Sequence, residues 1–296
     1  MPLTGILAVD KQPGWTSHDV VARVRRLAGQ RQVGHTGTLD PLATGLLLVV
    51  LGQATRLSSL LMESPKTYLA EVVLGATTAT DDAEAPLLQA RDTAGISRAD
   101  IEAVLPRFIG DLAQIPPAYA AVRQGGEKMY ALARRGIVVD APPRQVTVHG
   151  ITIEAWSNPR LRLLIRCGPG TYIRSLARDL GEALTVGGYL HALRRLSSGA
   201  FSIEDAHTLE SLEHIEIHTA LLPPDRAVAG WSAAVLSPEE VVRVQRGQAI
   251  VVSGCTSGNV RLYGSGGMLV ALAECRDMVA GPFRVFTLEG PCAGGD

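Results

Sequence analysis

Apolar and polar residues alternate along this 296-residue chain in a way that predicts strands and helices in turn. Residues 6–9 are apolar and short enough for a buried strand, and residues 46–51 form a second such run. Between them, apolar residues recur at helical spacing, which predicts a helix that begins after a Thr16 cap and ends at Gly29 (Val20, Val21, Val24 and Leu27).

The alternation continues through the middle of the chain. We expect a helix at residues 54–62 and a strand at residues 68–74. Ser97 and Asp100 have the spacing of a capping box, which predicts a helix that ends near Pro106. A further helix is expected at residues 126–136, because glycine stands at both ends.

A hairpin followed by a helix is expected next. Apolar residues recur with a period near two in residues 146–153 and again in residues 161–167, which predicts two strands of one antiparallel hairpin. The Gly-Pro-Gly turn at residues 168–170 then leads into a helix. Arg174 and Arg178 are four residues apart in this helix and therefore share one face.

After a connection at residues 221–226, the last quarter of the chain differs from the rest in its pattern of short apolar runs and glycine-rich turns. Ser237 is the predicted cap of a helix that ends at Gly247. The chain is longer than one core usually organises, so we expect a large domain at residues 1–225 and a small β-barrel at residues 226–296. The predicted strands of the barrel are short and separated by glycine-rich turns: 249–252, 260–263, 268–275 and 283–288.

Charge is balanced overall but unevenly distributed. The net charge is −1 and the pI is about 6.7, which by itself argues against a nucleic-acid binder. Residues 123–178, however, contain ten Lys or Arg against three acidic residues. Acidic residues gather at 81–111 and 204–216, which we expect to form a solvated surface away from a polyanion.

Other classes of protein are disfavoured by what the chain contains. The four cysteines have neither the paired spacing of a zinc site nor that of a disulfide framework, so reduced thiols are expected (Cys167, Cys255, Cys275 and Cys292). His214 and His218 are interpreted as a surface pair. No apolar run approaches the ~18 residues of a membrane span, and the first residues do not resemble a signal peptide. We therefore expect a cytoplasmic protein.

The segment with the most chemical content is Gly-His-Thr-Gly-Thr-Leu-Asp-Pro-Leu-Ala-Thr-Gly at residues 34–45. It places one carboxylate, Asp40, in a loop that is too rich in glycine and threonine for a helix. Asp40 has two interpretations. It can form an Asx-turn before the buried strand, or it can be presented to a ligand in a pocket that His35 also borders.

These twelve residues closely resemble the active-site motif of the tRNA pseudouridine-55 synthases, the TruB family, in which this aspartate cannot be replaced. The resemblance extends over residues 5–209, although in this chain the proline that usually follows Lys11 directly comes one position later. It implies an α+β pseudouridine synthase fold, with a mainly antiparallel central sheet flanked by helices. The C-terminal residues resemble, more loosely, the PUA domain that often follows this catalytic domain.

The resemblance also implies roles for other residues. Arg174 would pair with Asp40, although from its own sequence context it could equally contact a phosphate. Tyr68 would stack on the target base and help to remove the C5 proton. The remaining positions would contact substrate: His35, Tyr172, Leu193, Lys11 and Lys66.

The implied reaction breaks the N1 glycosidic bond of uridine, turns the base, and joins C5 to the ribose. One carboxylate suffices, acting either as nucleophile or as proton acceptor at the sugar, so neither a metal nor another cofactor is expected. The expected substrate is the T-arm of tRNA at uridine 55, bound by a monomer without a protein partner. Two alternatives are an RNA-guided synthase of ribosomal RNA and a tRNA-binding folding factor whose catalysis is dispensable.

Overall fold

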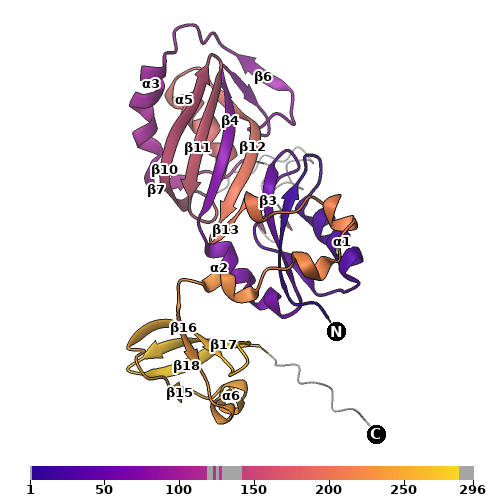
Figure 1. Ribbon diagram of the computed structural model, residues 1–296. Coiled ribbons are helices and arrows are strands. Elements are labelled where there is room, and N and C mark those ends of the chain that lie inside the picture. Colours follow the sequence, from indigo (N-terminus) through magenta and orange to yellow (C-terminus); the bar gives the residue numbers. More distant parts are fainter. Residues whose placement is uncertain (1, 119–122, 125–126, 129–141, 287–296) are drawn as a thin grey trace.

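A computed structural model describes residues 2–118, 123–124, 127–128 and 142–286. The predicted helix at 126–136 therefore lies outside the described residues. Within them, the large central sheet has nine strands, seven of which lie side by side in one continuous order (Figure 1): β1 (Gly5–Lys11), β3 (Thr44–Leu51), β12 (Gly188–Ser198), β4 (Lys66–Leu74), β11 (Arg160–Cys167), β10 (Arg144–Ser157) and β7 (Gly110–Gln114). Two short strands pair at its side, β2 (Val33–His35) with β3 and β13 (Phe201–Ser202) with β12.

The pairing of this sheet is mainly antiparallel, as predicted, and β10 and β11 form the expected hairpin. The exception is the contact between β12 and β3, which is parallel and joins Arg194 to Thr44 and Arg195 to Gly45. Gly45 has a φ of 94°, and a Cβ there would lie 2.4 Å from the Arg195 carbonyl oxygen. Only glycine allows the two strands to approach this closely.

Helices cover the sheet where the apolar pattern predicted them. Helix α1 (Ser17–Ala28) begins with a capping box at Thr16 and ends at Gly29, which has a φ of 61°. Helix α5 (Ile173–Ala183) packs its apolar side chains against those of β4 in the largest core cluster. The predicted helix at 54–62 is a 3-10 turn, η1 (Gly52–Leu57), followed by α2 (Ser58–Glu63).

The remaining elements of the large part are short. Helix α3 (Arg98–Val104) begins with the predicted capping box at Ser97 and continues into η2 (Leu105–Phe108). None of the helices in the described part of the chain is long and apolar enough to cross a membrane. The other elements are β5 (Ala76–Thr78), β6 (Leu87–Ala90), β8 (Arg123–Gln124), β9 (Glu127–Lys128), η3 (Ile203–Asp205), η4 (Ser211–Glu213), η5 (Ile217–Ala220) and η6 (Pro224–Val228).

A second, curled sheet follows the connection (Figure 1). The strand predicted at residues 283–288 begins and ends earlier, at residues 279–285. The strand at residues 232–235 was not predicted. Helix α6 (Pro238–Gln245) packs on this sheet after the expected Ser237 cap. The strand order is β14 (Ser232–Val235), β16 (Ser257–Tyr263), β17 (Leu269–Arg276), β18 (Val279–Val285) and β15 (Ile250–Val251).

The second sheet is not isolated from the first. Leu272 and Phe286 belong to the same buried cluster as Ile6, Leu46 and Leu57 of the large part. The Arg56 guanidinium also donates to the carbonyl oxygen of Val285. A division of the chain at residue 226 stays a prediction, and any such division leaves a shared apolar interface.

Candidate active site

Asp40 lies in the loop between β2 and β3, and this loop is fixed by the start of helix α1. The backbone N–H of Leu39 donates to the Ser17 hydroxyl (2.9 Å), and that hydroxyl donates to the Leu39 carbonyl oxygen (3.1 Å). The N–H of Gly14 donates to the carbonyl oxygen of Pro41 (2.9 Å). These bonds hold the backbone on both sides of Asp40, whose side chain stays 39% exposed.

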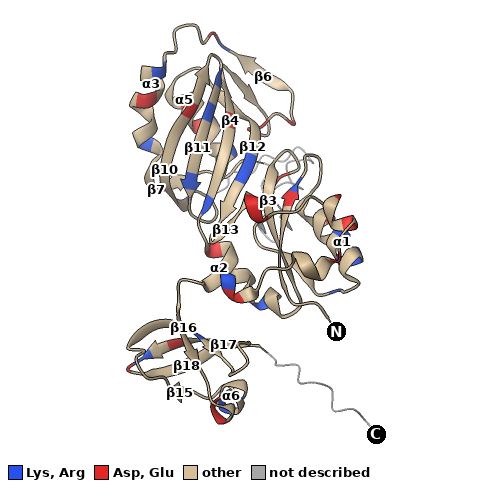
Figure 2. Ribbon diagram, in the orientation of Figure 1, with Lys and Arg blue, Asp and Glu red and all other residues tan. Residues whose placement is uncertain are grey.

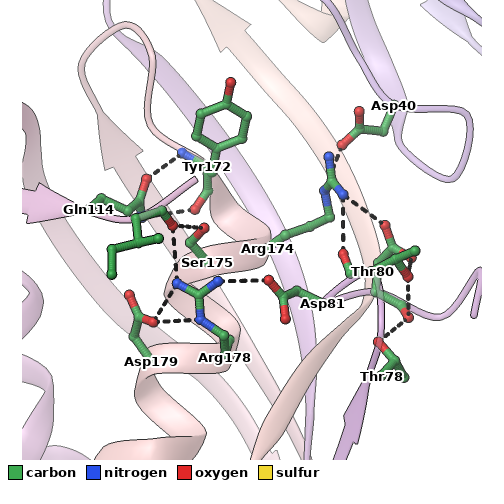
Figure 3. A network of polar contacts seen from close by, with 12 residues as sticks. Asp40, Thr78, Thr80, Asp81, Gln114, Tyr172, Arg174, Ser175, Arg178 and Asp179 are labelled. Atoms are coloured by element: carbon green, nitrogen blue, oxygen red, sulfur yellow. Dashed lines mark hydrogen bonds and ion pairs between the residues drawn. The ribbon is translucent and has the colours of Figure 1, made fainter. Parts of the chain in front are cut away.

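The Asp40 carboxylate is directed at an arginine rather than at its own backbone. Asp40 Oδ2 lies 3.0 Å from Nε of Arg174, which belongs to the first turn of α5. Figure 3 shows the same guanidinium facing Thr80, whose carbonyl oxygen lies 3.1 Å from Nη1. The same Nη1 lies 3.5 Å from Asp82 Oδ2. Asp82 is 2% exposed and also accepts a bond of 2.5 Å from the Thr80 hydroxyl. The guanidinium is thus held between two carboxylates.

The sequence-based expectation that the acidic segment 81–111 faces away from the site is wrong for its first two residues. Asp82 contacts Arg174, and Asp81 Oδ2 lies 2.8 Å from Nη1 of Arg178 (Figure 3). Arg178 also contacts Asp179 at 2.8 Å. The physical reason is that arginines buried on α5 need anionic partners, and the turn after β5 supplies them.

The fold separates the arginines of the basic stretch 123–178 onto opposite faces of the central sheet. Arg174 and Arg178 are enclosed in ion pairs, whereas Arg160, Arg162 and Arg166 alternate with buried residues of β11 and so lie on the opposite face of the sheet. Figure 2 shows Lys and Arg on β4, β11 and β12. Arg160 forms an ion pair with Glu71 on that open face.

A cavity of about 380 Å³ opens beside Asp40. It brings together four of the residues that the resemblance singled out as well as Asp40 and Arg174: Tyr68, Lys66, Tyr172 and Leu193. Burial raises the pKa of the Tyr68 hydroxyl above its usual value, so this side chain keeps its proton at neutral pH.

Tyr172 is held by a residue that sequence reasoning did not identify. The Gln114 side chain accepts from the Tyr172 backbone N–H (2.8 Å) and donates to its carbonyl oxygen (3.0 Å), as Figure 3 shows. This pair of bonds joins the end of β7 to the start of α5. Nothing in the sequence marks Gln114, because a single amide before Ile115 resembles any strand end.

Lys11 and His35 are not among the described residues that line this cavity. The fully buried Lys11 ammonium donates to the carbonyl oxygens of Trp15 (2.7 Å), Gln12 (3.1 Å) and Pro41 (3.2 Å), and burial lowers its pKa to about 8. His35 lies with its ring centroid 5.8 Å from that of His18. Through its bond to Pro41, Lys11 fixes the backbone directly after Asp40.

Lys66 lines the cavity, but its ammonium is engaged elsewhere. It donates to the carbonyl oxygens of Ser64 (2.6 Å) and Leu61 (3.4 Å) and to that of Met62, at the end of helix α2. Burial lowers its pKa to about 8. Its position therefore stabilises the end of that helix.

Arg195 is a further cavity residue that the sequence did not single out. It is 1% exposed, and Nε donates to the Leu46 carbonyl oxygen (2.6 Å) while Nη2 donates to that of Gly37 (3.1 Å). The sequence contains adjacent arginines at 194 and 195. Which of them faces inward depends on a strand that the apolar pattern did not predict.

Comparison with known proteins agrees with this geometry. The family model described as TruB family pseudouridylate synthase (N terminal domain) matches residues 25–173, and that described as tRNA pseudouridylate synthase B C-terminal domain matches residues 174–229. The tRNA pseudouridine synthase B of Xanthomonas axonopodis pv. citri (strain 306) is 45% identical over 271 residues, which cover 90% of this chain and 88% of that protein. The protein of the same name from Thermobifida fusca (strain YX) is 45% identical over 291 residues, covering 95% and 98%.

Solved structures show the same fold. A chain of a Cbf5-Nop10-Gar1 complex is 26% identical with a TM-score of 0.73, covering 96% of this chain and 85% of that one. A chain of an H/ACA RNP bound to a substrate RNA containing 2'-deoxyuridine is 25% identical with a TM-score of 0.72, covering 96% and 86%. With family models matched over residues 25–229 and close identity over most of its length, the chain belongs to the TruB family of pseudouridylate synthases.

Proposed function

We propose that this chain converts uridine 55 in the T-loop of tRNA to pseudouridine, with Asp40 as the catalytic carboxylate. The observation that carries the proposal is the position of that carboxylate. It lies at the wall of a cavity of about 380 Å³, 3.0 Å from the buried Arg174 guanidinium and with the Tyr68 ring in the same lining. A single carboxylate that is oriented by a planar cation suits an isomerisation at one sugar carbon.

The reaction is a rearrangement within one nucleotide. The bond between N1 and C1′ breaks, the base turns, and a bond between C5 and C1′ forms, while C5 loses a proton and N1 gains one. Asp40 acts either by attacking C1′ or by accepting a proton from the sugar, and the geometry is compatible with both. Tyr68 keeps its proton and offers its ring as a surface on which the base stacks.

The target uridine must leave its stack to enter the cavity. Extruding a nucleotide costs a few kcal/mol, which stacking and phosphate contacts offset. We propose that the protein binds the T-arm as a monomer, without a protein partner, in the cytoplasm where tRNA is modified. The identity of 45% to proteins named tRNA pseudouridine synthase B, against 26% to the Cbf5 chain, supports tRNA over the RNA-guided alternative.

The test is incubation of the purified protein alone with an unmodified tRNA transcript, followed by mapping of pseudouridine at every position. Wild type should modify position 55. Asp40→Asn should form no product while binding tRNA within about threefold of wild type, because the amide keeps the shape and loses the chemistry. Asp100→Asn is the matched control, since that carboxylate caps helix α3 at the surface.

Three results would contradict the proposal: product at another position, a requirement for a guide RNA, or turnover by Asp40→Asn within about tenfold of wild type. A tRNA refolding assay on Asp40→Asn separates catalysis from a folding-factor role. Full refolding activity in that variant would show the two functions to be independent.

A further inference from the structure

Arg195 belongs to β12, the strand that lies between β3 and β4 in the central sheet. Its backbone pairs with Gly45 on β3 and with Tyr68 on β4, so one residue of β12 is adjacent to both the Asp40 loop and the stacking tyrosine. Its side chain turns into the cavity and is 1% exposed. The parallel pairing of β3 with β12 consists, among the described residues, of this pair and the neighbouring one at Arg194.

The guanidinium of Arg195 is bound on both sides of Asp40, to the loop before it and to strand β3 after it. Gly37 precedes Asp40 and Leu46 follows it, and Arg195 donates to the carbonyl oxygen of each, at 3.1 Å and 2.6 Å. Two carbonyls at a fixed separation match the planar fork of a guanidinium, which an ammonium does not reproduce. A single rigid group therefore joins the start of the Asp40 loop to strand β3.

The same guanidinium also acts on Tyr68, the residue of β4 with which the Arg195 backbone pairs. Its charge lowers the pKa of the Tyr68 hydroxyl, against the larger effect of burial. Arg195 thus interacts with the loop of Asp40 and with Tyr68, the two groups that the reaction needs at a fixed distance from one substrate.

Burying a cation costs more free energy than burying an apolar side chain of similar volume. In the described part of the chain, Arg195 is hydrogen-bonded to carbonyl oxygens rather than to a carboxylate. Burying a charge without a counter-charge costs stability, and an apolar residue of similar volume would pack there at lower cost. Packing alone therefore does not explain why an arginine occupies this position.

We propose that Arg195 is a positioning residue that holds the Asp40 loop at a fixed distance from Tyr68. This inference rests on the proposed function of Asp40. The neighbouring Arg194 provides a matched control on the same strand. It forms a two-pronged ion pair with Asp10 of β1 (3.0 and 2.8 Å), is 38% exposed, and does not line the cavity among the described residues.

The experiment compares Arg195→Met, Arg195→Lys and Arg194→Met with wild type. Steady-state and single-turnover rates on tRNA give kcat and KM, and hydrogen exchange reports the backbone of residues 36–47. Arg195→Met should lower kcat by about 100-fold, as a displacement near 1 Å does, and leave KM within about threefold. Exchange in residues 36–47 should become faster. Arg195→Lys should recover at most about a tenth of the lost rate, and Arg194→Met should match wild type in kcat and in loop exchange.

Several outcomes would overturn the inference. A kcat of Arg195→Met within about threefold of wild type, or unchanged exchange in residues 36–47, would show that the loop holds its position without Arg195. Full recovery by Arg195→Lys would assign the effect to charge instead of geometry. Unfolding of both variants, checked by circular dichroism, would make Arg195 a structural residue only. An inactive wild type would defeat the proposed function instead, and loop exchange would still decide the role of Arg195.

Discussion

Replacing Arg174 with methionine tests the site and the fold together. The guanidinium is 6% exposed and contacts Asp40, Asp82 and the Thr80 carbonyl oxygen at once. Methionine fills much of the same volume and offers no donor. The variant therefore leaves one carboxylate in the cavity without its orienting partner and a second carboxylate buried without a cation.

The expected loss of stability comes mainly from Asp82. Its side chain is 2% exposed, and breaking a buried ion pair from one side costs about 3–5 kcal/mol. The contact is 3.5 Å long, and Asp82 keeps its bonds from Thr80 and from the Glu84 backbone, so we expect the lower part of that range or slightly less, about 2–3 kcal/mol. Asp40 is 39% exposed and adds little, because water screens it.

Calorimetry and turnover assays measure the two effects separately. Arg174→Met should lower Tm by about 5–10 °C. It should also lower kcat by about 100-fold or more, since Asp40 is no longer held. Adding Asp82→Asn to this variant removes the unpaired buried charge and should restore about 1–2 kcal/mol of stability without restoring activity.

Two results would refute this reasoning. If the double variant were less stable than Arg174→Met, the charge of Asp82 would not be the cause of the instability. If Arg174→Lys turned over at the wild-type rate, a point charge would suffice and the guanidinium geometry would be irrelevant.

Two further predictions follow from burial. Because the folded-state pKa of Lys66 is lowered to about 8 from 10.5, the unfolded chain binds more protons above pH 8, and this residue makes stability rise with pH up to about 10.5. Between pH 7.5 and 9, wild type should gain about 1 kcal/mol relative to Lys66→Met in denaturant unfolding, and equal slopes would refute the assignment. Ending the chain at Arg226 removes Val228, Leu272 and Phe286 from a shared cluster, and each such side chain contributes about 1.5–3 kcal/mol. The fragment should therefore melt lower and bind tRNA more weakly while keeping turnover at saturating tRNA within about tenfold, and an unchanged Tm would show that the cluster contributes nothing.

Local signals in the sequence determined much of the fold. The Thr16 capping box and Gly29 define α1, and period-two alternation defines the hairpin of β10 and β11, because both depend on residues close together in the chain. The Asp40 motif marked the candidate carboxylate for the same reason. Tyr68, Tyr172 and Leu193 were expected as site residues through the family resemblance, and the structure places them around one cavity.

Only the tertiary structure decided how the site is supported. Strand β12 was not predicted, because its leucines recur every three positions (Leu190, Leu193 and Leu196) and not every two, with register shifts between Leu190 and Ala192 and between Arg195 and Ser197. Without that strand, the sequence cannot show that Arg195 faces the cavity and Arg194 does not. Asp82 lies 92 residues before Arg174 and meets it only because burial of the guanidinium requires a counter-charge from a distant turn. Such partners are selected by desolvation in the folded state, and no local pattern records them.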